Sequence, residues 1–197
     1  MMETKKMERK DMKLSDYVIE YLHSRGTKHV FGMSGGAAVH LFDSAAKHLG
    51  VGTTFVAHEQ SAAMAADGYY RVSGQVGACV VTSGPGATNL LTGVCCSYYD
   101  SVPTLMLTGQ VATHRLKGQR KVRQVGFQET DSLSIYSSVT KYAEQVRVEK
   151  YIDSYKRLAG ELAKHGDLID VNVSGELAVL GWIEKCMAWS FEAPKRT

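Results

Sequence analysis

The chain has 197 residues, of which 44% are hydrophobic and 22% charged, and 23 basic residues stand against 20 acidic ones. This length is typical of one domain, and the composition excludes a disordered, collagen-like or coiled-coil chain. The sequence contains neither a long apolar run nor the apolar core of a signal peptide, and basic residues do not form the stripe that a nucleic-acid face needs. We therefore expect a cytoplasmic protein with no membrane or nucleic-acid partner.

Short apolar runs that end in glycine alternate with segments of helical period along most of the chain. Such alternation predicts an α/β fold, a doubly wound and mainly parallel sheet with helices on both faces. Ligands of such sheets bind at the carboxyl ends of the strands, where these glycine turns lie. We expect strands at residues 29–33, 53–57, 76–82, 104–108, 139–142 and 168–173, and helices at residues 14–22, 37–49, 59–72, 87–99, 149–164 and 175–189.

We expect three segments in the chain. Residues 1–12 form a ragged, charged N-terminus, residues 13–145 form the domain, and residues 146–197 form an extension of the same domain. Within the domain, residues 112–128 are polar and basic, which indicates a long loop. The seven histidines and four cysteines lack the spacing of a zinc site, so we expect no metal ligands.

Three junctions between a strand and a helix contain residues that could bind a ligand. Gly35 and Gly36 allow a close backbone approach to a ligand, although a plain tight turn has the same signature. Glu59 follows the second strand, where a carboxylate can simply offset a helix dipole. The turn at residues 82–89 suggests a dinucleotide-binding oxidoreductase, but Asn89 stands where that fingerprint has its third glycine.

Taken together, the junctions form an ordered series of five motifs between about residue 14 and residue 142. The series resembles the N-terminal, pyrimidine-binding domain of thiamine-diphosphate enzymes, and the acetolactate synthase branch most closely. The matching residues are His58-Glu59-Gln60 with Gly68-Tyr69 and Arg71, Thr82-Ser83-Gly84-Pro85-Gly86-Ala87-Thr88-Asn89, Asp100-Ser101 with Pro103, Thr108-Gly109-Gln110-Val111, and Phe127-Gln128-Glu129.

This resemblance implies specific roles for individual residues. Glu59 corresponds to the glutamate that hydrogen-bonds the aminopyrimidine ring of thiamine diphosphate and favours the tautomer that removes the thiazolium proton, and we expect Glu59 to be buried. Gln128 corresponds to a glutamine that faces the bound intermediate, and His58 is expected in the pocket because it adjoins Glu59. The residues expected to touch the cofactor are Met33, Ser34, Gly35, Gly36, Ala37, Glu59, Thr82, Pro85, Gly86 and Asn89.

The chain also departs from this family. Met33-Ser34 differs from the usual turn, and the stretch from Arg123 to Glu129 looks more like relatives found beside surface-polysaccharide genes. No Gly-Asp-Gly sequence is present, so magnesium and diphosphate binding would need a partner domain, and a flavin is not assigned.

Several functions therefore stay open at this point. The chain is interpreted as the pyrimidine-binding half of an enzyme that decarboxylates a 2-keto acid such as pyruvate and joins it to an acceptor. It would be inactive without a diphosphate-binding domain, and it would form a homodimer or pair with a separate diphosphate-binding subunit. The alternatives are a non-catalytic relic or regulatory subunit, a carboligase of surface-sugar biosynthesis and, more weakly, the oxidoreductase.

Overall fold

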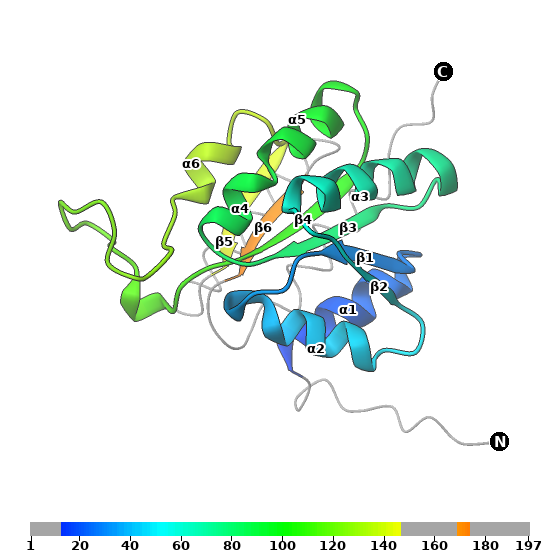
Figure 1. Cartoon of the computed structure of the whole chain (residues 1–197), viewed down its shortest axis with the longest axis horizontal. Helices are drawn as coiled ribbons and strands as arrows, with labels where there is room; N and C mark the ends of the chain where they lie inside the picture. The colour runs from blue at the N-terminus through cyan, green and yellow to red at the C-terminus, as the bar shows by residue number, and fades with distance from the viewer. Residues whose placement is uncertain (1–12, 147–168, 174–197) are drawn as a thin grey trace.

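The computed structural model describes residues 13–146 and 169–173 (Figure 1). The expected helices at 149–164 and 175–189 lie outside these residues. The helices are α1 (Leu14–Ser24), α2 (Val39–Lys47), α3 (Glu59–Ser73), α4 (Pro85–Asn89), α5 (Leu91–Tyr99) and α6 (Ser132–Tyr136), with 3-10 turns at Gly36–Ala38 and Thr113–Arg115. The strands are β1 (His29–Gly32), β2 (Gly52–Phe55), β3 (Gly77–Val81), β4 (Thr104–Gly109), β5 (Tyr142–Val146) and β6 (Ile169–Val173).

The described strands form one sheet of six in the order β2-β1-β3-β4-β6-β5, and every neighbouring pair is parallel. Parallel neighbours require crossover connections, which the helices supply. The order places β6 between β4 and β5, although it follows both in the chain. The α/β, doubly wound fold class predicted from the sequence is therefore confirmed.

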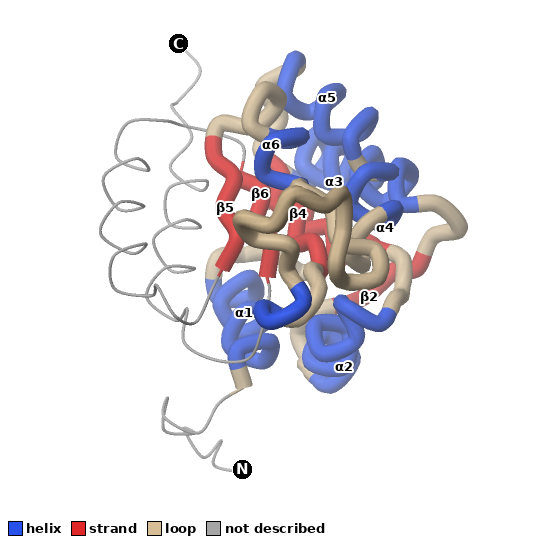
Figure 2. Tube along the Cα trace, turned by 90° about the vertical axis from the view of Figure 1, so that its left-hand side faces the viewer, coloured by secondary structure: helices blue, strands red, loops and turns tan. Residues whose placement is uncertain are grey.

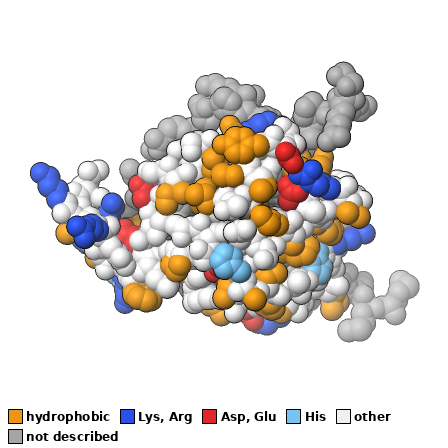
Figure 3. Space-filling model, turned by 45° about the horizontal axis from the view of Figure 1, so that its top comes forward, with side chains coloured by type: hydrophobic (Ala, Val, Ile, Leu, Met, Phe, Trp, Pro, Cys, Tyr) orange, Lys and Arg blue, Asp and Glu red, His pale blue; other side chains and the backbone are white. Residues whose placement is uncertain are grey.

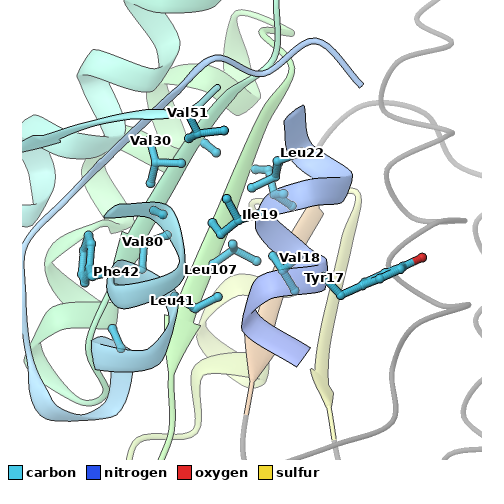
Figure 4. Close-up of a cluster of buried hydrophobic side chains, with 14 of the residues drawn as sticks. Tyr17, Val18, Ile19, Leu22, Val30, Leu41, Phe42, Val51, Val80 and Leu107 are labelled. Atoms are coloured by element: carbon cyan, nitrogen blue, oxygen red, sulfur yellow. The ribbon is translucent and has the colours of Figure 1, made fainter. Parts of the chain in front are cut away.

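Helices cover both faces of this sheet (Figure 2), and each face has its own hydrophobic core. On one side α1 and α2 pack against the strands, with Ile19, Leu22 and Phe42 among the buried side chains (Figure 4). On the other side α3, α5 and α6 cover the sheet with smaller side chains, Ala62, Ala63 and Ala66 among them.

Strand β3 contributes side chains to both hydrophobic cores. All five of its residues are buried. Because side chains alternate along a strand, Ala78 and Val80 join the core under α1 and α2, whereas Cys79 and Val81 join the core under α3 and α5. A continuous apolar run of this kind is typical of a central strand in a parallel sheet.

The structure differs from the expected elements at three places. The helix expected at 87–99 is interrupted at Leu90, where the N–H bonds the carbonyl of Ala87 three residues back. The strand expected at 139–142 starts only at Tyr142, because Val139 is buried against the α3 side. Helix α6 was not expected, since five residues are too short to show a period, but Asp131 caps its first turn through the N–H of Ser134.

A membrane-spanning helix is not found within residues 13–146 and 169–173, since none is long and apolar enough.

The loop after β4 closes on itself around one carboxylate. Glu129 Oε1 accepts a hydrogen bond from the backbone N–H of Lys117 at 2.6 Å, and Oε2 accepts from the N–H groups of Val125 at 2.9 Å and Gly126 at 3.3 Å. Gln110 ties the two ends of the loop together, because its amide nitrogen donates to the carbonyl oxygen of Thr130 at 2.8 Å. The long loop predicted from the sequence is thus folded around Glu129.

These contacts set the charge state of Glu129. Burial alone would raise the pKa of its carboxyl, but the hydrogen bonds from the N–H groups of Lys117, Val125 and Gly126 outweigh burial, so the pKa lies below its ordinary value of 4.5. Because the folded-state pKa is lowered, the stabilisation is fully present above the ordinary value. It is lost as the pH falls through the lower folded-state value.

We predict that the amide resonances of Lys117, Val125 and Gly126 titrate together in NMR spectra, with a midpoint below 4.5. In Glu129→Gln this transition disappears, and hydrogen exchange of the three amides becomes at least about tenfold faster, as expected for lost charge-assisted hydrogen bonds. Amides of β3 serve as the internal control. A midpoint at or above 4.5 would contradict the assignment.

Candidate functional site

The candidate site is formed by loops at the carboxyl edge of the sheet. The segments that follow β1, β2, β3 and β4 leave the sheet at this edge, because all four strands are parallel. They carry the residues predicted from the sequence, from Met33 to Gln128. The site therefore combines segments that are far apart in the chain.

Glu59 is the first residue of α3 and is only 7% exposed. Its Oε2 accepts a hydrogen bond from Asn89 Nδ2 at 3.0 Å. Its second oxygen, Oε1, accepts no hydrogen bond from any residue that the structure describes. The expected burial of Glu59 is confirmed. Oε1 is not one of the fully buried side-chain oxygens that lack a partner, so it is open to solvent and accessible to a ligand.

Asn89 holds this carboxylate from a neighbouring helix. It is the last residue of α4, and its side chain is half-buried. The amide donates rather than caps a helix, so the position where a dinucleotide fingerprint has a third glycine is used here to orient Glu59. This role argues against the oxidoreductase hypothesis.

Two glycines pack so closely against Thr82 that a side chain at either position would collide with it. A Cβ atom at Gly35 would lie 2.4 Å from Thr82 Cβ, and one at Gly86 would lie 2.7 Å from Thr82 Cγ2. The Gly86 position is also close to the unpaired oxygen, since the same atom would lie 3.7 Å from Glu59 Oε1. Thr82 Oγ1 accepts a hydrogen bond from the N–H of Ala37 at 3.3 Å. We call Gly35, Ala37, Thr82 and Gly86 the cradle.

Gln128 reaches the same region through the turn after β3. A Cβ atom at Gly84 would lie 2.7 Å from the carbonyl oxygen of Gln128 and 2.8 Å from its Cβ. Both residues have a positive φ, +60° in each case, which is uncommon for a residue with a side chain. Only glycine fits at position 84, so this contact fixes the position of Gln128 against the glycine turn.

The other predicted site residues lie on the same loops, next to the cradle in the chain. Met33 is half-buried and its N–H bonds the carbonyl of Val80, and Ser34 is exposed. A Cβ atom at Gly36 would meet nothing within 4 Å, and Pro85 is exposed at the start of α4.

His58 was expected beside Glu59 in the pocket, and the structure shows it exposed at the start of α3. Its ring is exposed, and Nδ1 accepts a hydrogen bond from the N–H of Gln60 at 3.2 Å. His58 therefore acts as the N-cap of α3, and it fixes where the helix begins and hence where Glu59 lies.

Sequence reasoning missed the contacts that hold α3 against α5. A Cβ atom at Gly93 would lie 2.4 Å from Ala63 Cβ, so the two helices approach closely. Asp67, which is buried, accepts a hydrogen bond from Ser97 Oγ at 2.8 Å and pairs with Arg71 at 2.5 Å. Arg71 also pairs with Asp100 at 2.5 Å, and these partners raise its pKa.

Two further residues belong to the motifs quoted from the sequence, but their structural tasks were not foreseen. Gly109 is the last residue of β4, and a Cβ atom there would lie 2.6 Å from Ala37 Cβ. Gly109 therefore packs directly against the loop that follows β1. Glu129 organises the loop that follows β4, as described above. A signal for Glu129 exists in the sequence, because it is the first acidic residue after Asp100.

Among the described residues, His, Cys, Asp and Glu side chains do not form any group of three or more that could hold a metal ion. The chemistry of the site therefore lies in one buried carboxylate, one amide and a cradle that backbone and small side chains line.

Comparison with known proteins identifies the family. A model described as "Thiamine pyrophosphate enzyme, N-terminal TPP binding domain" matches residues 12–135. Over 159 residues the chain is 41% identical to the "Probable acetolactate synthase large subunit" of Methanocaldococcus jannaschii, a match that covers 79% of this chain and 25% of that protein.

Two bacterial relatives give the same result. The "Acetolactate synthase large subunit" of Lactococcus lactis is 40% identical and the "Acetolactate synthase isozyme 3 large subunit" of Escherichia coli is 38% identical, each over 152 residues, which cover 77% of this chain and 25% of the relative. The chain thus spans about a quarter of the length of these curated relatives. The resemblance predicted from the sequence motifs is confirmed: the chain belongs to the thiamine pyrophosphate enzymes, as their N-terminal cofactor-binding domain.

Proposed function

We propose that this chain binds the pyrimidine end of thiamine diphosphate in an enzyme that decarboxylates a 2-keto acid such as pyruvate and transfers the remaining fragment to an acceptor. The observation that carries the proposal is the buried Glu59 carboxylate, which Asn89 holds by one oxygen while the other is unpaired beside Gly86. The names of the relatives support the reaction class.

Each residue has a definite task in this proposal. Glu59 Oε1 exchanges a proton with the pyrimidine ring nitrogen, and Asn89 keeps the carboxylate oriented through Oε2. The ring lies against the backbone of the cradle, where Gly35 and Gly86 pack closely on Thr82 because they lack side chains. Gln128, fixed against Gly84, lies at the edge where the substrate enters. The bound cofactor itself supplies the electron sink for decarboxylation.

The diphosphate group and its magnesium need other ligands. The described residues offer no metal-binding group, so we propose that a separate domain or subunit completes the site. A 2-keto acid would then react between that domain and the cradle.

We also propose that the chain associates through the face of α3 and α5, either with a second copy or with that subunit. Apolar side chains gather on this face (Figure 3), and Met64, Val72 and Tyr99 are exposed on these two helices by 41%, 90% and 74%. Exposed apolar area of this kind is typical of a surface that a partner covers.

Replacing Glu59 tests the function directly. With a diphosphate-domain protein from the same source, we expect calorimetric titration with thiamine diphosphate and magnesium to give heat, and the mixture to turn over a 2-keto acid. Glu59→Gln should fold normally but lose roughly 10²- to 10⁴-fold in turnover, since the carboxylate acts as an acid and base.

The matched control is Glu20→Gln, an exposed carboxylate on α1 that pairs only with His48 among the described residues. Undiminished turnover in Glu59→Gln would overturn the assignment. Absence of heat for the unmodified chain, with and without the added domain, would favour the non-catalytic relic.

The cradle is tested by two neighbouring glycines. Gly35→Ala should weaken thiamine diphosphate binding at least about tenfold, because the new methyl group collides with Thr82 and overpacking of this kind costs about 1–3 kcal/mol. Gly36→Ala should leave the affinity unchanged, since nothing lies within 4 Å of the added atom. Equal affinities of the two variants in the calorimeter would show that the ring binds elsewhere.

Association is tested by sedimentation equilibrium at micromolar concentration. The unmodified chain should be at least dimeric when no partner is present, or should bind the diphosphate-domain protein. Met64→Glu should weaken that association, whereas Leu49→Glu, equally apolar and fully exposed after α2, should not. A monomer that binds neither would contradict this proposal.

A further inference from the structure

The loop after β4 carries more positive charge than the one carboxylate inside it, Glu129, can balance. It projects from the body at the left of Figure 1, and Lys and Arg side chains gather at the corresponding tip in Figure 3. No acidic residue occurs from position 101 to position 128 of the sequence. We call residues 113–125 the basic loop; it carries Arg115, Lys117, Arg120, Lys121 and Arg123.

The side chains of this loop are available to a ligand. Arg115, Arg120, Lys121 and Arg123 are exposed, and none of the five basic residues forms an ion pair with any described residue. The nearest acids in the chain are already engaged. Glu129 is an anion that binds backbone N–H groups of the loop and attracts Lys117, so it balances one of the five positive charges, and Asp131 caps α6.

The basic loop is attached directly to the candidate site. Glu129, which organises it, follows Gln128, and Gln128 packs against Gly84 in the glycine turn. Gly86, two residues further, lies beside Thr82 and the free oxygen of Glu59. Gln128 therefore links the basic loop to the glycine turn of the candidate site.

Five cations exceed what a simple 2-keto acid needs. A 2-keto acid carries one carboxylate, and a single arginine or lysine would balance it. Arginine guanidinium groups match the oxygens of phosphate in pairs, and lysines add point charges. Apolar contacts are available as well, because Val122 and Val125 are about half exposed within the same loop.

We infer that the basic loop binds the phosphate group of a phosphorylated carbonyl compound, the acceptor in the proposed reaction. This inference rests on the proposed function, because it assigns the substrate class of the same site. The acceptor's carbonyl lies toward Gln128 and the cradle, and its phosphate lies among the side chains of the basic loop.

The test separates the loop from the cradle. The probes are inorganic triphosphate, which reports phosphate binding alone, and dihydroxyacetone phosphate against dihydroxyacetone, which differ only by the phosphate group. We expect calorimetric binding of triphosphate and dihydroxyacetone phosphate to the full chain, and none of dihydroxyacetone. Amide shifts in NMR spectra should change at residues 113–129.

Charge-matched variants give the decisive comparison. Lys117→Gln with Lys121→Gln should weaken binding of both phosphate probes about tenfold, which corresponds to about 1.4 kcal/mol. The control variant, Lys28→Gln with Lys47→Gln, removes the same charge from residues outside the basic loop. It should weaken binding of the phosphate probes less than about twofold. Glu59→Gln should retain triphosphate binding even though it loses turnover, so failure of the loop and failure of the cradle are distinguishable.

Four results would overturn the inference. The first is equal weakening by the two lysine pairs, and the second is the absence of triphosphate binding at millimolar concentration. The third is tighter binding of a ten-residue polyglutamate peptide than of triphosphate, where that binding is weakened by the changes in the loop. Such a result would assign the loop to an acidic protein partner. Binding of triphosphate but not of dihydroxyacetone phosphate would likewise exclude a phosphorylated acceptor.

Discussion

Helix α3 must lie close to α4 and α5, because the hydrogen bond between Glu59 and Asn89 joins side chains from two different helices. The close approach is possible because Ala63 faces Gly93, where any larger pair of side chains would collide. The buried Asp67 then fixes the spacing through Ser97 and Arg71. The site at the start of α3 thus depends on packing one to three turns further along the same helix.

This dependence explains which parts of the molecule the sequence revealed. The strands and long helices were predictable, because apolar runs and glycine turns are local signals and β3 and β4 are continuous buried runs. The interruption of the expected helix 87–99 at Leu90 was not predictable. It depends on one hydrogen bond, which the N–H of Leu90 donates to the carbonyl of Ala87. Helix α6 was missed for a similar reason, because it is stabilised by Tyr136, whose hydroxyl donates to the carbonyl of Ala87 across the fold.

The candidate site was likewise predictable from the sequence only in part. Motif resemblance found Glu59, Asn89, Thr82 and both glycines of the cradle, which the structure brings together. Resemblance could not show that His58 would point outward, because a residue at an N-cap satisfies its own helix first. Nor could it show the roles of Asp67 and Glu129, which come from partners 30 and 12 residues away in the chain.

The position of β6 has a consequence for how the chain is made. Strand β5 leaves the ribosome before β6, yet in the sheet it pairs only with β6, which separates it from β4. Until Val173 has been synthesised, β4 presents an open edge and β5 has no partner within the described sheet. Translation therefore completes the lateral edge of the sheet beyond β4 last, after the four strands that carry the site loops.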